Sequence, residues 1–340
     1  MKKQVLVFGH SDLDGAGVQI IGEAIAQAQG LPCETYRCSY HDVNSKIMEA
    51  IRQYTPQGIA QILIGDISVN KETATQLCEL NKQGVEVILR DHHQSAEWLN
   101  CYCWAYVAEN EDGASHCGTY LLAREFYPAY VKYRIFIETV DSWDVWTWKE
   151  TNNTAAKDLN SLFQIMGTQD FIQYIKDINM DEVHSPEDLF TDEARRLIEF
   201  YDRSALKTAQ FCESFMWTAD FKFPRCKRAL KGGVIFCNNY ISDVAEYILT
   251  NHPEIDFLML CGMPRSISFR TQKQLPISLA YVAKYMTGSG GGHPQASGAV
   301  LTAGQFKDMF KSNLNILSGG SVGIHNLGLY SQQDPHKRGD

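Results

Sequence analysis

The sequence predicts an α/β fold, in which an N-terminal doubly wound parallel sheet and a smaller C-terminal α/β domain are joined by a helical connector. Through the first half of the chain, apolar runs of strand length alternate with segments of helical spacing, which is typical of a parallel βαβ sheet. Strand patterns then disappear after about residue 150 and return near residue 228. With 340 residues, the chain is long enough to bury two separate hydrophobic cores.

The N-terminal half contains apolar runs that we expect to form strands at 4–9, 33–38, 59–65 and 85–90. Helical spacing predicts helices at 15–29, 43–53, 71–83, 115–127 and 131–148. Right-handed crossovers are expected between the strands. The carboxyl ends of the strands should therefore face one crevice, as in other open parallel sheets.

The second half begins with a stretch, 154–214, that is rich in helix formers and lacks strand character. Within it, Ser185-Pro186-Glu187-Asp188 is typical of a helix start, so we expect a long connecting helix from there. Strands are predicted at 228–237, 256–261 and 266–270, with a helix at 241–250. The predicted segments are a first domain at 1–150, a helical insert and connector at 151–224, a second domain at 225–330 and a frayed tail at 331–340.

Composition limits the class of partner. The chain carries 31 basic and 40 acidic residues, and this net charge of −9 argues against a protein that binds long duplex nucleic acid by broad phosphate neutralisation. No stretch is long and apolar enough for a transmembrane helix, and the start lacks a signal-peptide core, so we expect a cytoplasmic protein without a membrane partner. The oligomeric state is open, and a homodimer is compatible with the sequence.

Three short polar segments each follow an apolar run of strand length. They are His10-Ser11-Asp12-Leu13-Asp14-Gly15, Ile64-Gly65-Asp66 and Arg90-Asp91-His92-His93. Residues just past the ends of parallel strands converge although they are far apart in sequence. In the first segment the two-residue period of the histidine and the two acids would point all three side chains the same way. The pattern predicts a two-metal hydrolytic centre.

The donor types indicate which metals would bind. Carboxylates mixed with imidazoles, and no thiolate, favour two divalent cations, Mn²⁺ above all, with Mg²⁺, Co²⁺ or Fe²⁺ as alternatives and zinc less favoured. Two such ions could activate a bridging water and stabilise the charge on a departing oxygen. Each motif alone has a structural explanation, such as a helix cap or a turn. Their occurrence in this order after three predicted strands is what favours the metal centre.

These segments resemble the DHH phosphoesterase family, whose name comes from the triplet seen here as Asp91-His92-His93. The family includes RecJ-like exonucleases, oligonucleotide-degrading nanoRNases, cyclic dinucleotide phosphodiesterases and, more distantly, inorganic pyrophosphatases. Its first motif is matched at His10 to Asp14 and its second at Asp66. Its fourth motif, an acid in a helix-rich segment, is matched best by Asp141, with Asp144 as the rival.

The resemblance implies roles for these residues. One ion would be held by His10, Asp12 and Asp66, and the other by Asp14, Asp66, His92 and Asp141. Asp66 would bridge the ions. His93 would contact the scissile phosphate or protonate the leaving oxygen. Asp91 would orient an imidazole rather than bind metal, so that Asp66, Asp91 and His93 form the candidate catalytic set.

A glycine cluster in the second domain is similar to the GGGH motif of the DHHA1 domain, which accompanies DHH domains in the nucleotide-cleaving branches. It reads Gly290-Gly291-Gly292-His293, and it follows Ser266 to Arg270, which resembles the SxR strand of the same domain. Glycine lets the backbone approach a ligand closely, and arginine binds phosphate oxygens in a fork. The resemblance implies a substrate-binding set of His93, Arg270, Gly290, Gly291, Gly292 and His293.

Together these features predict a metal-dependent phosphodiesterase that hydrolyses short oligonucleotides or small, including cyclic, nucleotides to nucleoside monophosphates. Two alternatives remain open: a RecJ-like single-strand exonuclease and a non-catalytic nucleotide sensor of the same fold. A processive exonuclease would be expected to carry more strand-holding modules and a more basic groove. A sensor would normally lack at least one of the carboxylates, whereas this chain has the complete set.

Overall fold

The computed structural model describes residues 3–110, 113–151, 153–288 and 290–305, so the predicted tail at 331–340 lies outside the described residues. The chain divides into two units, unit 1 up to Tyr201 and unit 2 from Asp202. Each unit has its own sheet and its own hydrophobic cores. In the described part of the chain, no helix has both the length and the hydropathy that crossing a membrane requires.

Unit 1 is built on a parallel sheet of five strands in the order β2-β1-β3-β4-β5. The strands are β1 (Gln4–Gly9), β2 (Cys33–Arg37), β3 (Ile59–Gly65), β4 (Glu86–Asp91) and β5 (Ala105–Val107). The first four agree with the prediction, whereas the three-residue β5 was not predicted. Because the strand order reverses between β1 and β3, their carboxyl ends flank the crevice where such sheets bind ligands.

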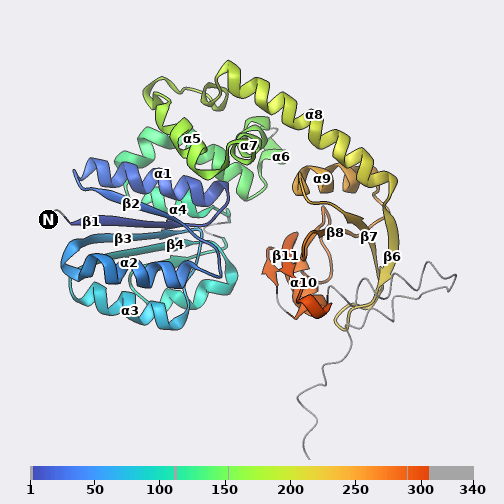
Figure 1. Cartoon of the computed structure of the whole chain (residues 1–340), viewed down its shortest axis with the longest axis horizontal. Coiled ribbons are helices and arrows are strands. Elements are labelled where there is room, and N and C mark those ends of the chain that lie inside the picture. Colours follow the sequence, from blue (N-terminus) through green and yellow to red (C-terminus); the bar gives the residue numbers. More distant parts are fainter. Residues whose placement is uncertain (1–2, 111–112, 152, 289, 306–340) are drawn as a thin grey trace, which may run out of the picture. The chain divides into compact units, whose positions relative to one another are not determined.

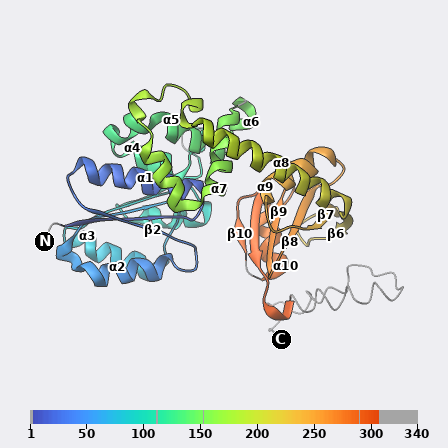
Figure 2. The same cartoon turned by 45° about the horizontal axis from the view of Figure 1, so that its top comes forward.

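Helices cover both faces of this sheet, which confirms the doubly wound arrangement (Figure 1). One face packs against α1 (Leu13–Ala28) and α4 (Gly118–Arg124), on which α5 (Tyr127–Asp144) and α7 (Thr154–Asp177) form a further layer. The other face packs against α2 (Val43–Gly58) and α3 (Lys71–Lys82). Along β1, Val5 and Val7 enter the first core and Leu6 and Phe8 the second. This alternation is the period-two pattern of a strand buried on both faces. Figure 2 shows α1 and α2 on opposite sides of the sheet.

Unit 2 is a smaller α/β unit with a mixed sheet of six strands in the order β10-β11-β9-β8-β7-β6. The strands are β6 (Trp217–Phe221), β7 (Leu230–Phe236), β8 (Phe257–Gly262), β9 (Ser266–Arg270), β10 (Gly291–Gly292) and β11 (Ala296–Val300). Among the described strands of this second sheet, only β7 and β8 pair in parallel. One face packs against α10 (Leu279–Thr287) and the other against α9 (Ile241–Asn251).

The residues of the predicted segment 151–224 are shared between the two units. Helix α7 buries Leu159 and Phe171 in the core of unit 1, and β6 joins the sheet of unit 2. Helix α8 (Asp192–Ser214) contains the division, and a short helix α6 (Trp148–Thr151) precedes α7. Ser185 and Asp188 do form a capping box, but it begins a single 3₁₀ turn, Pro186–Leu189, and α8 starts only at Asp192.

Candidate metal centre

The polar residues that follow β1 are fixed by the start of α1. Asp12 is the N-cap of this helix, because its Oδ1 accepts a hydrogen bond of 3.0 Å from the backbone N–H of Gly15. The other oxygen, Oδ2, lies 2.7 Å from Nδ1 of His10. A Cβ at position 15 would lie 2.2 Å from the carbonyl oxygen of His10, so only glycine permits this tight strand-to-helix turn. The turn brings His10 and Asp12 to the carboxyl edge of the sheet.

Asp66 occupies the end of the neighbouring strand β3 and is almost completely buried. Its φ of +56° lies in the left-handed region that residues other than glycine rarely adopt. Its Oδ2 lies 3.7 Å from Nδ1 of His10, while its Oδ1 lies 3.4 Å from Nε2 of His92. The two oxygens of Asp66 therefore face the histidines of two different strands.

Asp14 is also buried and is held by the N-terminus of α4. Its two oxygens each accept a hydrogen bond of 2.7 Å, from the backbone N–H groups of Gly118 and Thr119. Start-of-helix N–H groups lack partners within the helix and favour negative charge. These hydrogen bonds hold the carboxylate in its orientation. Asp14, His92 and Asp144 each offer one potential ligand atom, and the three atoms lie within 4.8 Å of one another.

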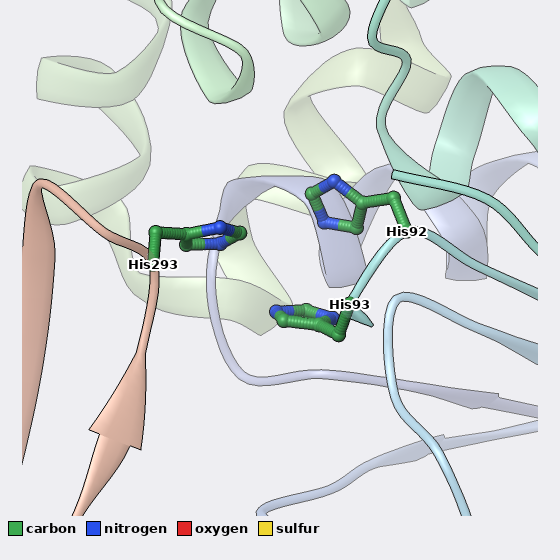
Figure 3. A group of neighbouring side chains, drawn as sticks. All are labelled: His92, His93 and His293. Carbon is green, nitrogen blue, oxygen red and sulfur yellow. The ribbon is translucent and has the colours of Figure 1, made fainter. Parts of the chain in front are cut away.

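His92 lies between the two groups of acids. Its Nε2 is 3.4 Å from Oδ1 of Asp66 and 3.4 Å from Oδ2 of Asp144. Figure 3 shows its imidazole beside that of His93 on the segment that follows β4, with ring centroids 4.6 Å apart. The structure thus gathers one donor group of His10, Asp12 and Asp66 and a second of Asp14, His92 and Asp144, which meet at Asp66.

Asp141, the residue that sequence reasoning preferred for the fourth motif, is not in either donor group. Its Oδ2 lies 2.9 Å from Nδ1 of His116, and its Oδ1 accepts 2.7 Å from the backbone N–H of Cys117. Both oxygens are therefore engaged just before α4 begins. Asp144, the rival, lies at the last position of α5, and its Oδ2 lies 3.4 Å from Nε2 of His92, so the geometry favours Asp144 for the fourth motif. The two acids are three residues apart on one helix face, so spacing could not separate them.

Asp91 holds the segment of His92 and His93 in place through hydrogen bonds. It is fully buried and accepts hydrogen bonds from the backbone N–H of His92 at 2.8 Å, from the hydroxyl of Ser68 and from Nδ1 of His93 at 2.7 Å. Burial by itself would raise the pKa of Asp91, but the hydrogen bond from His93 and the neighbouring imidazoles lower it to about 2. An ionised Asp91 holds a proton on Nδ1 of His93 and leaves Nε2 as the outward atom.

Tyr40 is a residue of this site that sequence reasoning missed. Its hydroxyl lies 3.1 Å from Nε2 of His93, and its ring centroid lies 5.1 Å from that of His10. It belongs to the loop that follows β2, the strand next to β1. The available signal was its position past the end of a fourth predicted strand, where side chains also reach the crevice.

The electrostatics of the centre fit bound cations. Burial raises the pKa of Asp66 well above its usual value, and the carboxylates of Asp12 and Asp14 raise it further. Burial likewise raises the pKa of Asp144. Among the described residues, the buried Oδ2 atoms of Asp66 and Asp144 have no hydrogen-bond partner. Such atoms are costly unless a cation or a proton satisfies them, and oxygen and imidazole donors suit Mn²⁺ or Mg²⁺.

In unit 2, the predicted substrate-binding residues lie on neighbouring strands. Arg270 ends β9 and pairs with Ala296 of β11, while Gly292 of β10 pairs with Ser297 of the same strand. The guanidinium of Arg270 donates to the backbone oxygens of Phe269 and Ser297, and burial lowers its pKa to about 10. The φ angles of Gly290 and Gly292, +154° and +126°, are ones that other residues rarely adopt.

The comparisons with known proteins agree with this arrangement. No protein-family model matches the chain. The curated oligoribonuclease NrnB of Bacillus subtilis (strain 168) is 26% identical over 306 residues, which cover 87% of this chain and 72% of NrnB.

Two solved structures share the fold. A crystal structure of the exonuclease RecJ bound to manganese has a TM-score of 0.55 and 15% identity, and covers 94% of this chain and 91% of that one. RecJ from Thermus thermophilus in complex with Mn²⁺ has a TM-score of 0.52 and 18% identity, and covers 93% of this chain and 52% of that one. At these identities the likeness concerns the fold. With its motifs gathered at the carboxyl edge of the parallel sheet, the chain resembles the DHH/DHHA1 phosphoesterases in sequence pattern and in fold.

Proposed function

We propose that this protein is a metal-dependent phosphodiesterase that hydrolyses short oligoribonucleotides to nucleoside monophosphates. The observation that carries the proposal is the pair of donor groups that share Asp66, one oxygen of which faces His10 and the other His92. The similarity to an oligoribonuclease supports RNA as the substrate class. The complete set of acids distinguishes this function from that of a non-catalytic sensor.

The residues present suit two divalent cations, with Mn²⁺ as the preferred metal. The first donor group is His10, Asp12 and Asp66, and the second is Asp14, His92 and Asp144. Asp66 would join the second group through the oxygen that lies 3.4 Å from His92. When bound, two such ions supply Lewis acidity that lowers the pKa of water and stabilises negative charge on a phosphoryl group. Asp14 and Asp12 are held by helix N-termini before any ion binds, so little rearrangement of the chain is required.

His93 is positioned to act on the substrate rather than on a metal. Its Nδ1 is engaged by the carboxylate of Asp91, so that Nε2 is its working atom. When protonated, Nε2 can donate a hydrogen bond to a non-bridging oxygen or a proton to the leaving oxygen of the scissile bond. Asp91 would orient the ring and stabilise the imidazolium, as second-layer carboxylates do for other catalytic histidines.

We assign the binding of the nucleotide portion of the substrate to unit 2. Arg270 would contact a phosphate, and the backbone of Gly290, Gly291 and Gly292 together with His293 would approach a sugar or base closely. The strand pairing that places Arg270 and Gly292 on either side of β11 supports this assignment. If it holds, Arg270→Ala raises KM for a dinucleotide much more than KM for a simple aryl phosphodiester.

The function is tested by incubating the purified protein with Mn²⁺ and identifying the products by mass. The panel contains diribonucleotides, longer RNA and DNA oligomers, cyclic dinucleotides and pyrophosphate. We expect the fastest turnover on RNA of a few nucleotides, with monophosphates as products, and its loss in Asp66→Ala. The exposed acid Asp181 provides a matched control, since Asp181→Ala should retain full activity. Normal turnover by Asp66→Ala, or cleavage of pyrophosphate alone, would refute the proposal.

A further inference from the structure

The turn between β6 and β7 in unit 2 is strongly basic although the whole chain is acidic. Residues 222–229 contain Lys222, Arg225, Lys227 and Arg228 and no acid, and all four side chains are exposed. The net charge of the chain is −9. A local concentration of positive charge on an acidic protein attracts anions to that place and not to the surface in general.

Aromatic rings lie directly beside these charges. The guanidinium of Arg225 lies 4.9 Å from the ring centroid of Tyr281 on α10, which is cation–π geometry. The rings of Tyr281 and Tyr285 are stacked, with centroids 5.9 Å apart and an interplanar angle of 20°, and Phe223 contacts Tyr285 edge-on. Both tyrosines are partly exposed. The turn therefore packs on a short ladder of rings along α10.

The four cations have different structural roles. Arg228 forms a bidentate pair with Asp256, with N···O distances of 2.6 and 2.8 Å, which anchors the turn to the edge of β8. Lys222 and Lys227 form no ion pair with any residue that the structure describes. Arg225 contacts a ring and no carboxylate in the same part of the chain. Three positive charges are thus available to an external anion.

We propose that this surface, formed by Lys222, Arg225, Lys227, Tyr281 and Tyr285, binds single-stranded RNA beyond the nucleotides held at the glycine segment of the same unit. Cations paired with exposed rings suit a chain of phosphates with unstacked bases, because each base has a face that can stack on an aromatic ring. A duplex hides those faces. The inference rests on the proposed function, since it assumes an RNA substrate.

The position of the surface makes its effect depend on length. The glycine segment lies in β10 at one edge of the six-stranded sheet and packs against α10, the helix that carries both tyrosines, whereas the cations lie on the turn that joins β6 and β7 at the opposite edge. A dinucleotide bound at the glycine segment would leave these cations without a phosphate, whereas a longer strand would also reach them. The surface thus increases affinity for oligomers of several nucleotides without changing the binding of a dinucleotide.

The test measures binding without hydrolysis. The full chain is titrated in EDTA against fluorescein-labelled RNA of two and of eight nucleotides over a range of salt, and the double variant Arg225→Gln, Lys227→Gln is compared with the parent. On single strands, each phosphate contact contributes about 0.7 to the slope of log K against log salt concentration. The double variant removes two such contacts, so its slope for the eight-mer should be smaller than that of the parent by about 1.4. Binding of the two-mer should not change. Tyr281→Leu should weaken binding of the eight-mer at least about fivefold at every salt concentration.

Lys82→Gln, Lys207→Gln is the matched control, because it removes the same charge from exposed positions away from α10 and should bind both RNAs like the parent. The proposed RNA-binding surface would be refuted if the double variant and the parent bound the eight-mer with equal affinity. It would also be refuted if the double variant lost as much affinity for the two-mer as for the eight-mer. Displacement of the eight-mer by a poly-glutamate peptide of the same charge would point to a site for acidic peptides instead. Because no hydrolysis is measured, these outcomes are separate from a failure of the proposed catalytic activity.

Discussion

The hydroxyl of Tyr40 lies 3.1 Å from Nε2 of His93, the imidazole whose other nitrogen is held by the buried carboxylate of Asp91. The histidine is therefore fixed from both sides, by residues from the loops after β2 and β4. Since Asp91 keeps the proton on Nδ1, the Tyr40 hydroxyl is the donor to Nε2 in the neutral ring. We expect Tyr40 to be a positioning residue, which would act on the proposed reaction through His93.

Removing this hydroxyl should slow the reaction without weakening substrate binding. One neutral hydrogen bond is worth about 1 kcal/mol, so we expect Tyr40→Phe to lower kcat about fivefold and leave KM unchanged. Nitrogen NMR of the His93 ring should show a broader tautomer mixture in this variant, a signal that does not depend on activity. Tyr54→Phe, which removes another hydroxyl of unit 1, is the control and should change neither quantity. A lower kcat with an unchanged His93 spectrum would refute the positioning role.

The choice between Asp144 and Asp141 predicts two different phenotypes. We expect Asp144→Asn to lose one of two bound Mn²⁺ ions, as measured by calorimetry or elemental analysis, because its carboxylate reaches His92. Asp141→Asn should keep both ions. It should instead lower the free energy of unfolding by about 1–2 kcal/mol, since it weakens the hydrogen bonds to His116 and to the amide of Cys117. If Asp141→Asn loses an ion and Asp144→Asn does not, Asp144 is not the fourth-motif ligand.

The parts of the fold that could be predicted are those with strong periodicity. Strands β1 and β3 are nearly continuous apolar runs because they are buried on both faces, and β4 contains the apolar run Val87–Leu89. Three strands of unit 2 have no such pattern: β6 is mostly exposed, β10 is two glycines and β11 consists of small residues and one exposed valine. These segments become strands only because a neighbouring strand pairs with them, and pairing partners cannot be derived from composition.

The same distinction holds for the site. His10, Asp66 and His92 could be singled out because each directly follows a strand, and parallel strands bring such positions together. Tyr40 lies three residues past the end of β2, in a loop where a tyrosine is common and carries no motif. The assignment of Asp144 depends on α4, whose N-terminal region occupies the carboxylate of Asp141. That contact is tertiary, and spacing along α5 does not contain it.

Metal binding should stabilise unit 1. Without cations, buried carboxyl groups at Asp66 and Asp144 lack partners, whereas an ion that binds only the folded state adds about 2.7 kcal/mol at a concentration of 100 times its Kd. We therefore expect Mn²⁺ to raise the melting temperature of the EDTA-treated protein by several degrees in calorimetry. Asp66→Asn should show much less of this rise, while Asp181→Asn should show all of it. The proposed metal centre would be contradicted if neither Mn²⁺ nor Mg²⁺ changed the melting temperature of the parent protein.

The ion pair between Arg228 and Asp256 should make the stability of unit 2 depend on acid pH. The hydrogen bond from Arg228 lowers the pKa of Asp256 below its usual value of 3.8, against the opposing effect of burial. A carboxyl whose pKa is depressed in the folded state stabilises the fold at pH values above its usual pKa of 3.8. That stabilisation is lost as the pH falls through the folded-state pKa. We expect Asp256→Asn to weaken protection of β7 and β8 amides in hydrogen exchange at pH 7 by about 1 kcal/mol. The difference from the parent should shrink as the pH drops below 3.8.

Asp220→Asn, at an exposed position on β6, is the control and should leave amide protection unchanged both at pH 7 and below pH 3.8. A difference that stays constant down to the acid limit would show that the ionised carboxylate is not what anchors the turn.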